Sequence, residues 1–224
     1  MRPFQTRHTR RVPPAPLRLL TLNGAVRGHG GNTGRALAVA ADHATGSGLD
    51  VDSVSLADFA GDVSALVKRV RAADVIVVGS GVYWSSWGSP LQRFLEVMTP
   101  YEATDVFVGK SVGVVLTMDS VGGADVAARL LFALSLFGCV SPPFAAVVLS
   151  RIAEMSAAHI DGDDVWQPAD LRVLVDNLAL QASTKPAWKC WPVLAADVVD
   201  GPWPLPGPLD LGLPDFLLTA RKAP

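Results

Sequence analysis

The chain contains only two cysteines, Cys139 and Cys190, among 224 residues, and only four histidines. Two cysteines cannot supply the four thiolates of an iron–sulfur cluster, and they match no paired motif of a structural zinc site. The histidines are scattered, without the spacing of metal ligands. We therefore expect no metal site. Cysteines this sparse, with no secretory signal, are typical of reduced thiols in a cytoplasmic protein.

An excess of positive charge is also missing, because 19 basic residues face 21 acidic ones and the net charge is −2. Nucleic-acid-binding proteins usually carry a basic face, so this function is disfavoured. One uncharged stretch, between Arg129 and Arg151, is long enough to span a membrane. Gly138, Pro142 and Pro143 divide it into a helical half and a strand half. We therefore expect a buried helix and a buried strand, and no membrane contact.

The two ends of the chain differ in composition from the region between them. Residues 1–16 are basic and rich in proline, with no apolar core of a secretion signal after Arg10-Arg11. They predict a flexible arm. Residues 185–224 contain eight prolines together with Trp188, Trp191 and Trp203. Proline at this density excludes a long helix. We expect an extended arm that packs on the body or on a neighbouring subunit, leaving residues 17–184 as one domain.

Strand and helix patterns alternate through residues 17–184. Five apolar segments predict strands: 17–22, 51–56, 74–79, 111–117 and 144–149. The third and fourth contain near-continuous apolar runs, which are typical of parallel strands covered on both faces. Helical patterns occupy 32–44, 62–72, 90–98, 124–137 and 170–183. This alternation predicts a doubly wound α/β domain, with helices on both faces of a parallel sheet.

A glycine-rich loop joins the first strand to the first helix, from Asn23 to Thr33. Such a loop directs backbone N–H groups and the positive end of a helix at one point, where a phosphate binds. Thr33 occupies the third glycine position of the dinucleotide fingerprint, and no Gly-Lys-Ser/Thr sequence is present. The donors Arg27, Asn32 and Thr33 therefore favour a phosphate monoester. The alternative is a plain glycine-rich turn with a helix cap.

A second loop, residues 80–90, follows the third strand and contains Tyr83, Trp84 and Trp87 among small residues. It lies at the carboxyl end of a strand, where open α/β sheets bind ligands. Aromatic side chains there can lie against a flat ring while backbone amides reach its polar edge. Packing of these aromatics in the core is the alternative interpretation.

At these loops the chain resembles the NAD(P)H-dependent FMN reductase family of flavodoxin-like proteins. The first loop matches through Gly24-Ala25-Val26-Arg27 with Asn32-Thr33, and the second through Gly81-Val82-Tyr83, Ser86 and Leu91-Gln92-Arg93-Phe94. A third loop, after the fourth strand, matches through its glycine pair in Asp119-Ser120-Val121-Gly122-Gly123. The resemblance covers residues 17–149 and implies a flavodoxin-like, five-stranded sheet of order 2-1-3-4-5.

The resemblance also implies the role of each loop. The FMN phosphate would bind to Gly24, Arg27, Asn32 and Thr33, and the isoalloxazine and ribityl chain would lie beside Val82, Tyr83, Trp84, Ser85 and Ser86. Asp119, Gly122 and Gly123 would bring the third loop to the ring. Tyr83 and Trp84 would shape the pocket for nicotinamide and acceptor by stacking, and no catalytic side chain is implied. Three residues depart from the family pattern: Ala25 replaces serine, Gly81 replaces proline and Gln92 replaces lysine.

The implied function is an FMN-dependent oxidoreductase that passes electrons from NADPH or NADH to a small acceptor such as a quinone or a flavin. Family members often form homodimers or homotetramers, and the carboxy-terminal arm would suit such an assembly. Two alternatives stay open: a flavodoxin-type electron carrier and a flavodoxin-like module that has lost flavin binding. Carriers tend to be strongly acidic, and the net charge of −2 disfavours that alternative.

Overall fold

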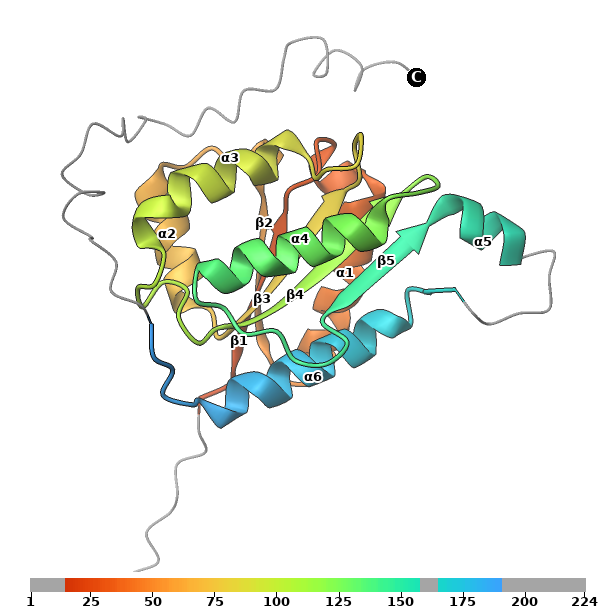
Figure 1. The fold of residues 1–224 in the computed structure, drawn as a ribbon. Coiled ribbons are helices and arrows are strands. Elements are labelled where there is room, and N and C mark those ends of the chain that lie inside the picture. Colours follow the sequence, from red (N-terminus) through yellow and green to blue (C-terminus); the bar gives the residue numbers. More distant parts are fainter. Residues whose placement is uncertain (1–14, 158–164, 191–224) are drawn as a thin grey trace, which may run out of the picture.

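The computed structural model describes residues 15–157 and 165–190. It contains a five-stranded, fully parallel sheet of order β2-β1-β3-β4-β5 (Figure 1). The strands are β1 (Arg18–Asn23), β2 (Asp50–Ser55), β3 (Val75–Gly81), β4 (Ser111–Met118) and β5 (Ala146–Ser150). Both the strand order and the flavodoxin-like architecture predicted from the sequence are confirmed.

Helices cover both faces of the sheet (Figure 1). One face is covered by α1 (Asn32–Gly46) and α6 (Asp170–Thr184), and the other by α2 (Val63–Ala72), α3 (Ser89–Met98) and α4 (Gly123–Leu136). A short helix, α5 (Arg151–Ala157), follows β5, and three 3-10 turns occupy Gly28–Gly30, Leu56–Asp58 and Thr99–Tyr101.

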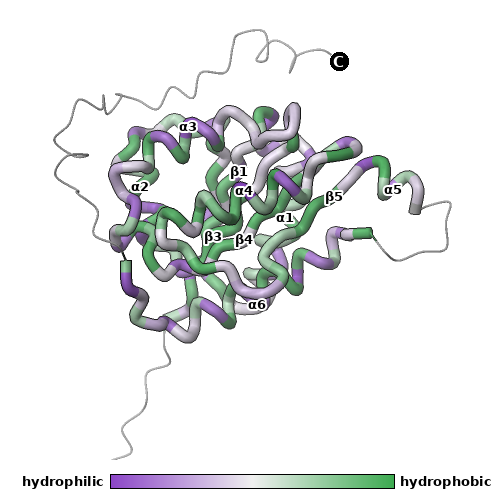
Figure 2. Tube along the Cα trace, viewed as in Figure 1, coloured by the Kyte–Doolittle hydropathy of each residue, from purple (hydrophilic) through white to green (hydrophobic). Residues whose placement is uncertain are grey.

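Each face of the sheet carries its own apolar core. Along β3, Ile76 and Val78 belong to the cluster under α2, α3 and α4, whereas Val75 and Val77 belong to the cluster under α1 and α6. This alternation follows from the two-residue side-chain period of a strand. Figure 2 shows the result, with the most hydrophobic colours on the central strands. Because all the strands are parallel, their carboxyl ends lie at one edge of the sheet, next to both cores.

The helix beginnings are capped in different ways. Asp62 caps α2, because its Oδ1 accepts a hydrogen bond from the Ala65 amide at 2.8 Å, and this bond holds the pKa of the Asp62 carboxyl below its usual value. Pro90 lies in the first turn of α3, where its missing N–H is no loss. Gly31 precedes α1 and provides no side-chain cap, which leaves amide donors available at this helix end.

Two details around β5 differ from the sequence-based prediction. The strand begins at Ala146 rather than at Phe144, which has a φ of 59° and is 75% exposed. A bulky side chain in this left-handed region marks a turn, so Phe144 belongs to the preceding loop. Helix α5 was not predicted. The Ser150 hydroxyl accepts a hydrogen bond from the Ala153 amide at 3.3 Å, which is the pattern of a serine cap.

Most of the two predicted arms lies outside the described residues. In the described part of the carboxy-terminal segment, the Trp188 indole lies beside Gly109, where a β-carbon would come within 3.2 Å of the indole Cδ1. The uncharged stretch of residues 130–150 contributes to α4, a loop and β5. Among the helices of the described ranges, none has the length and hydrophobicity that a membrane crossing requires.

The two thiols differ in environment, and this gives a first prediction. Burial raises the pKa of the Cys139 thiol to about 12, whereas Cys190 is exposed. Because only the thiolate reacts, we expect iodoacetamide at pH 8 to modify Cys190 alone in the folded protein and both cysteines in urea. Mass spectrometry of the peptides measures this. A folded Cys190→Ser variant that is alkylated as fast as the wild type would contradict the assigned burial of Cys139.

Candidate functional site

A cavity of about 310 Å³ opens at the carboxyl ends of β1, β3 and β4. The strand order reverses between β1 and β3, and this is the position at which open α/β sheets bind ligands. The lining residues come from the three loops predicted from the sequence, together with α1, the end of β4 and the start of α5: Ala25, Arg27, Gly30, Gly31, Asn32, Thr33, Arg35, Gly81, Val82, Tyr83, Thr117, Met118, Asp119 and Arg151.

The last residue of β1, Asn23, holds the first loop in shape. Its side chain is 2% exposed, and its amide group makes two hydrogen bonds to the loop backbone. The Nδ2 donates to the Gly28 carbonyl at 2.8 Å, and the Oδ1 accepts from the Ala25 amide at 3.0 Å. A buried amide group with both partners satisfied fixes the loop that leads into α1.

The amino terminus of α1 is arranged for an anion. In an α-helix the first amides have no intrahelical acceptor, and Gly31 supplies none here, so the amides of Asn32, Thr33 and Gly34 remain as donors. The first turn contains no acidic residue. Arg27 and Arg35 line the adjacent cavity, and the ion pairs among the described residues involve neither of them. The helix dipole and both guanidinium groups therefore favour negative charge at this position.

Thr33 connects the first helix to the end of β4. Its side chain is 1% exposed, and its Oγ1 lies 2.7 Å from the Thr117 Oγ1. Beyond Thr117, the Asp119 carbonyl accepts hydrogen bonds from the Ile152 amide at 3.0 Å and from the Ser150 hydroxyl at 3.3 Å. These bonds hold the start of the third loop against α5 and bring Arg151 to the cavity wall, with its Nη1 3.8 Å from the Asp119 Oδ1.

The second loop is held at both ends by Ser80, which is fully buried. Its hydroxyl donates to the Gly81 carbonyl at 3.0 Å and accepts from the Gly88 amide at 2.8 Å. The Tyr83 ring folds back over Gly81, where an added β-carbon would lie only 2.8 Å from the ring. The glycine that departs from the family pattern at this position therefore gives Tyr83 the space to form part of the cavity wall.

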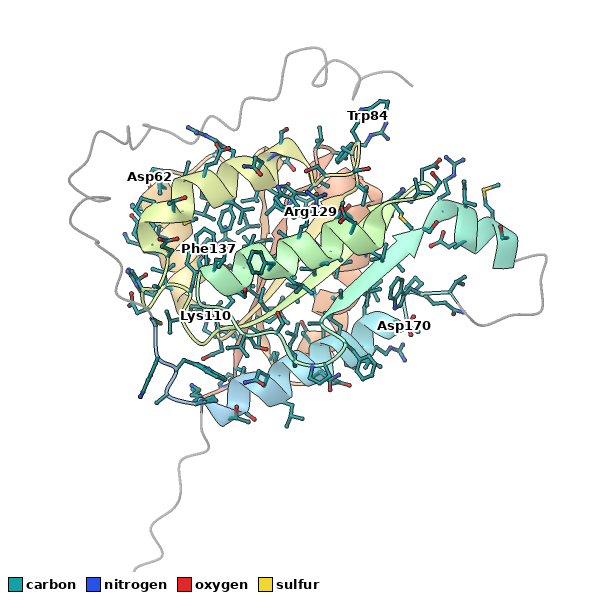
Figure 3. The ribbon with its side chains drawn as sticks, in the orientation of Figure 1. Asp62, Trp84, Lys110, Arg129, Phe137 and Asp170 are labelled. Carbon is teal, nitrogen blue, oxygen red and sulfur yellow. The ribbon has the colours of Figure 1, made fainter. Side chains whose placement is uncertain are left out.

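Between Tyr83 and Ser86 the second loop makes a tight turn. The two residues exchange backbone hydrogen bonds of 2.8 and 2.9 Å, and both central residues, Trp84 and Ser85, have positive φ values of 49° and 60°. Arg129 on α4 donates to the Ser85 carbonyl, and its guanidinium lies 5.5 Å from the centroid of the Trp87 ring. Figure 3 shows Arg129 below this loop and Trp84 at its outer edge.

Three glycines allow the loops to approach closely. A β-carbon on Gly24 would come within 2.4 Å of the Leu91 β-carbon on α3, and one on Gly88 within 2.6 Å of the Gly24 carbonyl. Gly122 directly precedes α4, has a φ of 89° and lies beside Ser85 of the second loop. The first and second loops, and the second and third, are therefore in direct contact with each other.

The structure brings half of the predicted site residues into the cavity wall: Arg27, Asn32, Thr33, Val82, Tyr83 and Asp119. The other half lies outside this lining: Gly24, Trp84, Ser85, Ser86, Gly122 and Gly123. Gly24 is buried under α3, Gly123 is packed against Val148 of β5, and Trp84 is 101% exposed.

Sequence reasoning missed Arg35, Thr117, Met118 and Arg151, which also line the cavity. The position of Arg35, one helical turn after Gly31, could have revealed it, because residues four apart share a helix face. Thr117 and Met118 end a strand at the edge where ligands bind, which is a weaker signal. Arg151 is placed by α5, and the sequence gives no clear pattern for that helix.

Comparisons with known proteins identify the family to which the chain belongs. A family model described as NADPH-dependent FMN reductase matches residues 17–154, more than half of the chain. The chain belongs to the NADPH-dependent FMN reductase family. Membership supports a flavin-dependent oxidoreductase. A search of curated proteins gives no match.

Solved structures share the fold at low sequence identity. RosB, solved with bound 8-demethyl-8-formylriboflavin-5'-phosphate, is 18% identical with a TM-score of 0.62, over 75% of this chain and 79% of that one. The NADH:FMN oxidoreductase EmoB in its apo form is 19% identical with a TM-score of 0.60, over 76% and 92% of the two chains. FerB, an NAD(P)H:acceptor oxidoreductase from Paracoccus denitrificans, is 18% identical with a TM-score of 0.55, over 75% and 98%.

The role of Asn23 in the first loop leads to a second prediction. Asn23→Leu removes both hydrogen bonds and leaves the buried Ala25 amide without a partner, whereas the Gly28 carbonyl keeps its bond from the Gly31 amide at 3.3 Å. An unsatisfied buried amide costs about 1–3 kcal/mol and the lost bond to the Gly28 carbonyl about 1 kcal/mol more, so we expect the free energy of unfolding in urea to fall by about 2–4 kcal/mol.

Thr21→Val is the matched control, since Thr21 is also buried on β1 but makes one hydrogen bond, to the Ser53 hydroxyl at 2.9 Å. We expect this variant to lose about 1 kcal/mol. An Asn23→Leu variant no less stable than Thr21→Val would show that Asn23 does not hold the loop.

Proposed function

We propose that the chain is an FMN-dependent oxidoreductase that takes electrons from NADPH or NADH and passes them to a small acceptor. The observation that carries the proposal is the uncapped amino terminus of α1, flanked by Arg27 and Arg35 and open to the cavity beside Tyr83. One ligand could therefore place its phosphate group at this helix end and its flat ring against the second loop. The cavity volume lies at the lower end of the roughly 300–1,000 Å³ range of small-molecule sites.

The donor set fits a phosphate monoester. The α1 amides would bind its oxygens, and the two arginines would balance its charge of about −2. Ala25 supplies no hydroxyl, and its amide is already bound to Asn23. Arg35 and Arg151, which sequence reasoning missed, line the same cavity and offset the absent hydroxyl with charged donors.

The remaining walls fit the ring end of FMN. Val82, Tyr83 and Met118 present apolar surface, and the backbone of the third loop begins at Asp119 beside them. When bound, FMN supplies the centre that accepts a hydride and gives up electrons. The chain then has to bind the flavin, orient its ring and leave one face open. We assign no side chain the role of general acid or base.

The proposal extends to the assembly and the location. We propose a homodimer or homotetramer in the cytoplasm, with the segment from residue 185 onward packing on the body or on a neighbouring subunit. The tryptophan and other apolar residues of that segment support its packing on the body or on a neighbour, and the low cysteine content supports the cytoplasm.

Spectroscopy of the purified protein tests the function directly. We expect absorbance bands of bound flavin, after incubation with FMN where needed, that bleach under anaerobic conditions when NADPH or NADH is added. An acceptor should then restore the bands. A bound flavin that neither nicotinamide bleaches would instead support the electron-carrier alternative. A protein that takes up no FMN would refute both functions.

The phosphate position gives a separate binding prediction. Arg27→Ala and Arg35→Ala should each weaken FMN binding by about 10-fold, because each removes a charge-assisted hydrogen bond to the phosphate. Neither should change the affinity for riboflavin, which has no phosphate. Quenching of flavin fluorescence in a titration measures both dissociation constants.

Arg172→Ala provides the control for this titration. Arg172 is exposed on α6 and does not line the cavity, so its loss should leave both affinities unchanged. Variants at Arg27 and Arg35 that weaken riboflavin and FMN binding equally would place the phosphate elsewhere.

A further inference from the structure

Another cavity, termed the β5 groove, lies along β5 and has a volume of about 1070 Å³, against about 310 Å³ for the candidate functional site. Its walls come from β5, the loop before it, α4, α5 and the start of α6. Figure 1 shows β5 at one edge of the sheet, with α4 on one face and α6 on the other. Among the described residues β5 pairs with β4 alone, so its outer side is open.

The lining of the β5 groove is rich in exposed apolar side chains. Phe144 is 75% exposed, and Ile152, Trp166 and Val173 are each about half-exposed. The one charged side chain in this lining is Asp170, whose Oδ2 accepts a hydrogen bond from the adjacent α6 entry, the Gln167 amide, at 2.7 Å. Exposed apolar side chains gathered in this way mark an interaction surface, and they suit an apolar occupant.

The chain itself contains an apolar segment, residues 191–224, which lies outside the described residues. Its sequence includes Trp191, Trp203 and Phe216 together with seven leucines. From residue 191 to residue 220 its charged side chains are four aspartates, with no lysine or arginine. Burial of apolar surface is favourable by about 25 cal/mol per Å², so a segment of this composition gains from an apolar surface to pack on. The composition of the segment therefore matches the lining of the β5 groove.

The described chain leads toward this groove. A β-carbon on Gly109 would lie 3.2 Å from the Trp188 Cδ1, and the Gly109 amide donates to the Gly138 carbonyl at 2.9 Å. Ser141 and Pro142, which follow Gly138 in the loop between α4 and β5, line the groove. Trp188 therefore lies one hydrogen-bonded neighbour away from the loop that forms one end of the groove.

The segment is long enough to cover the groove, and its attachment favours it over a separate protein. Fully extended, residues 191–224 would span about 110 Å. Strand β5, with five residues, is only about 17 Å long. A tethered segment has an effective concentration on the order of millimolar at a site within its reach. Even a weak contact would therefore keep the chain's own segment in the groove.

We propose that the β5 groove binds residues 191–224 of the same chain, with the tryptophan and leucine side chains of the segment against its exposed apolar lining. The inference narrows the packing proposed for this segment, on the body or on a neighbouring subunit, to one surface of its own chain. Ile152 lines the groove and Arg151, its neighbour on α5, lines the functional cavity, so a docked segment also supports that wall of the cavity.

Photo-cross-linking of the full chain tests the position of the segment. Phe144→p-benzoylphenylalanine places the photoreactive group in the groove at an exposed aromatic residue. We expect irradiation to link position 144 to peptides of residues 191–224, in a product that keeps the mass of a single chain. A product of twice that mass would place the segment on a neighbouring copy and overturn the inference. Cross-links that never reach the segment would overturn it too.

Two substitutions on α6 test the contact itself. Val173→Arg puts a charged side chain in the groove, whereas Leu180→Arg changes an exposed apolar residue of the same helix outside the groove and is the control. The readouts are the rate of chymotrypsin cleavage after Trp203 and Phe216 and the hydrogen exchange of the segment. Melting temperatures show that both variants are folded.

We expect Val173→Arg to raise the rates of cleavage and exchange by at least about 10-fold, because the guanidinium would lose hydration against apolar side chains. Leu180→Arg should keep both rates within about 2-fold of the wild type. Unchanged rates in Val173→Arg, or equal increases in the two variants, would refute docking in the β5 groove. Neither readout depends on bound flavin, so such a result would leave the proposed electron transfer standing.

Discussion

The site depends on one constraint: α1 begins without a side-chain cap directly after a loop whose shape Asn23 holds. The amides at this helix end have no protein acceptor, and a charged ligand can satisfy them. Because β1 is an interior strand, between β2 and β3, and contributes side chains to both apolar cores, both cores fix the position of this helix end. The second and third loops complete the site by lying close to this end of α1.

The second and third loops reach that position through contacts that depend on small residues. Gly24 and Gly88 let the first two loops meet, and Gly81 gives the Tyr83 ring its space. The residue at position 81 departs from the family pattern, yet here it is part of the packing of the wall. Near Ala25, which supplies no hydroxyl, the lining of the cavity contains Arg35 and Arg151. Two of the three departures, Ala25 and Gly81, therefore have neighbouring side chains that form the wall beside them.

Apolar runs, glycine clusters and helix periodicity are local signals, and they predicted the strands, the helices and the three loops. The strand order was implied only by the resemblance to the family. The sequence could not show which loop residues face the cavity, because loop conformation depends on distant contacts. Gly24, which was predicted to bind the ligand, lies buried against α3, and Trp84, which was predicted to border the ring, is exposed to solvent. Arg151 was missed because the bonds from Ser150 and Ile152 to the Asp119 carbonyl position α5 only in the folded chain.

The central claim is that the amides of α1 and the arginines beside them hold the phosphate of FMN. Phosphorus NMR of the FMN-loaded protein tests it most directly, because a free phosphate monoester changes charge with a pKa near 6. Fixed donors and positive charge should keep the bound phosphate in its dianionic form. The account predicts a shifted resonance that stays constant between pH 5.5 and 8, within the range where free FMN titrates. A bound-flavin resonance that titrates like free FMN would contradict it.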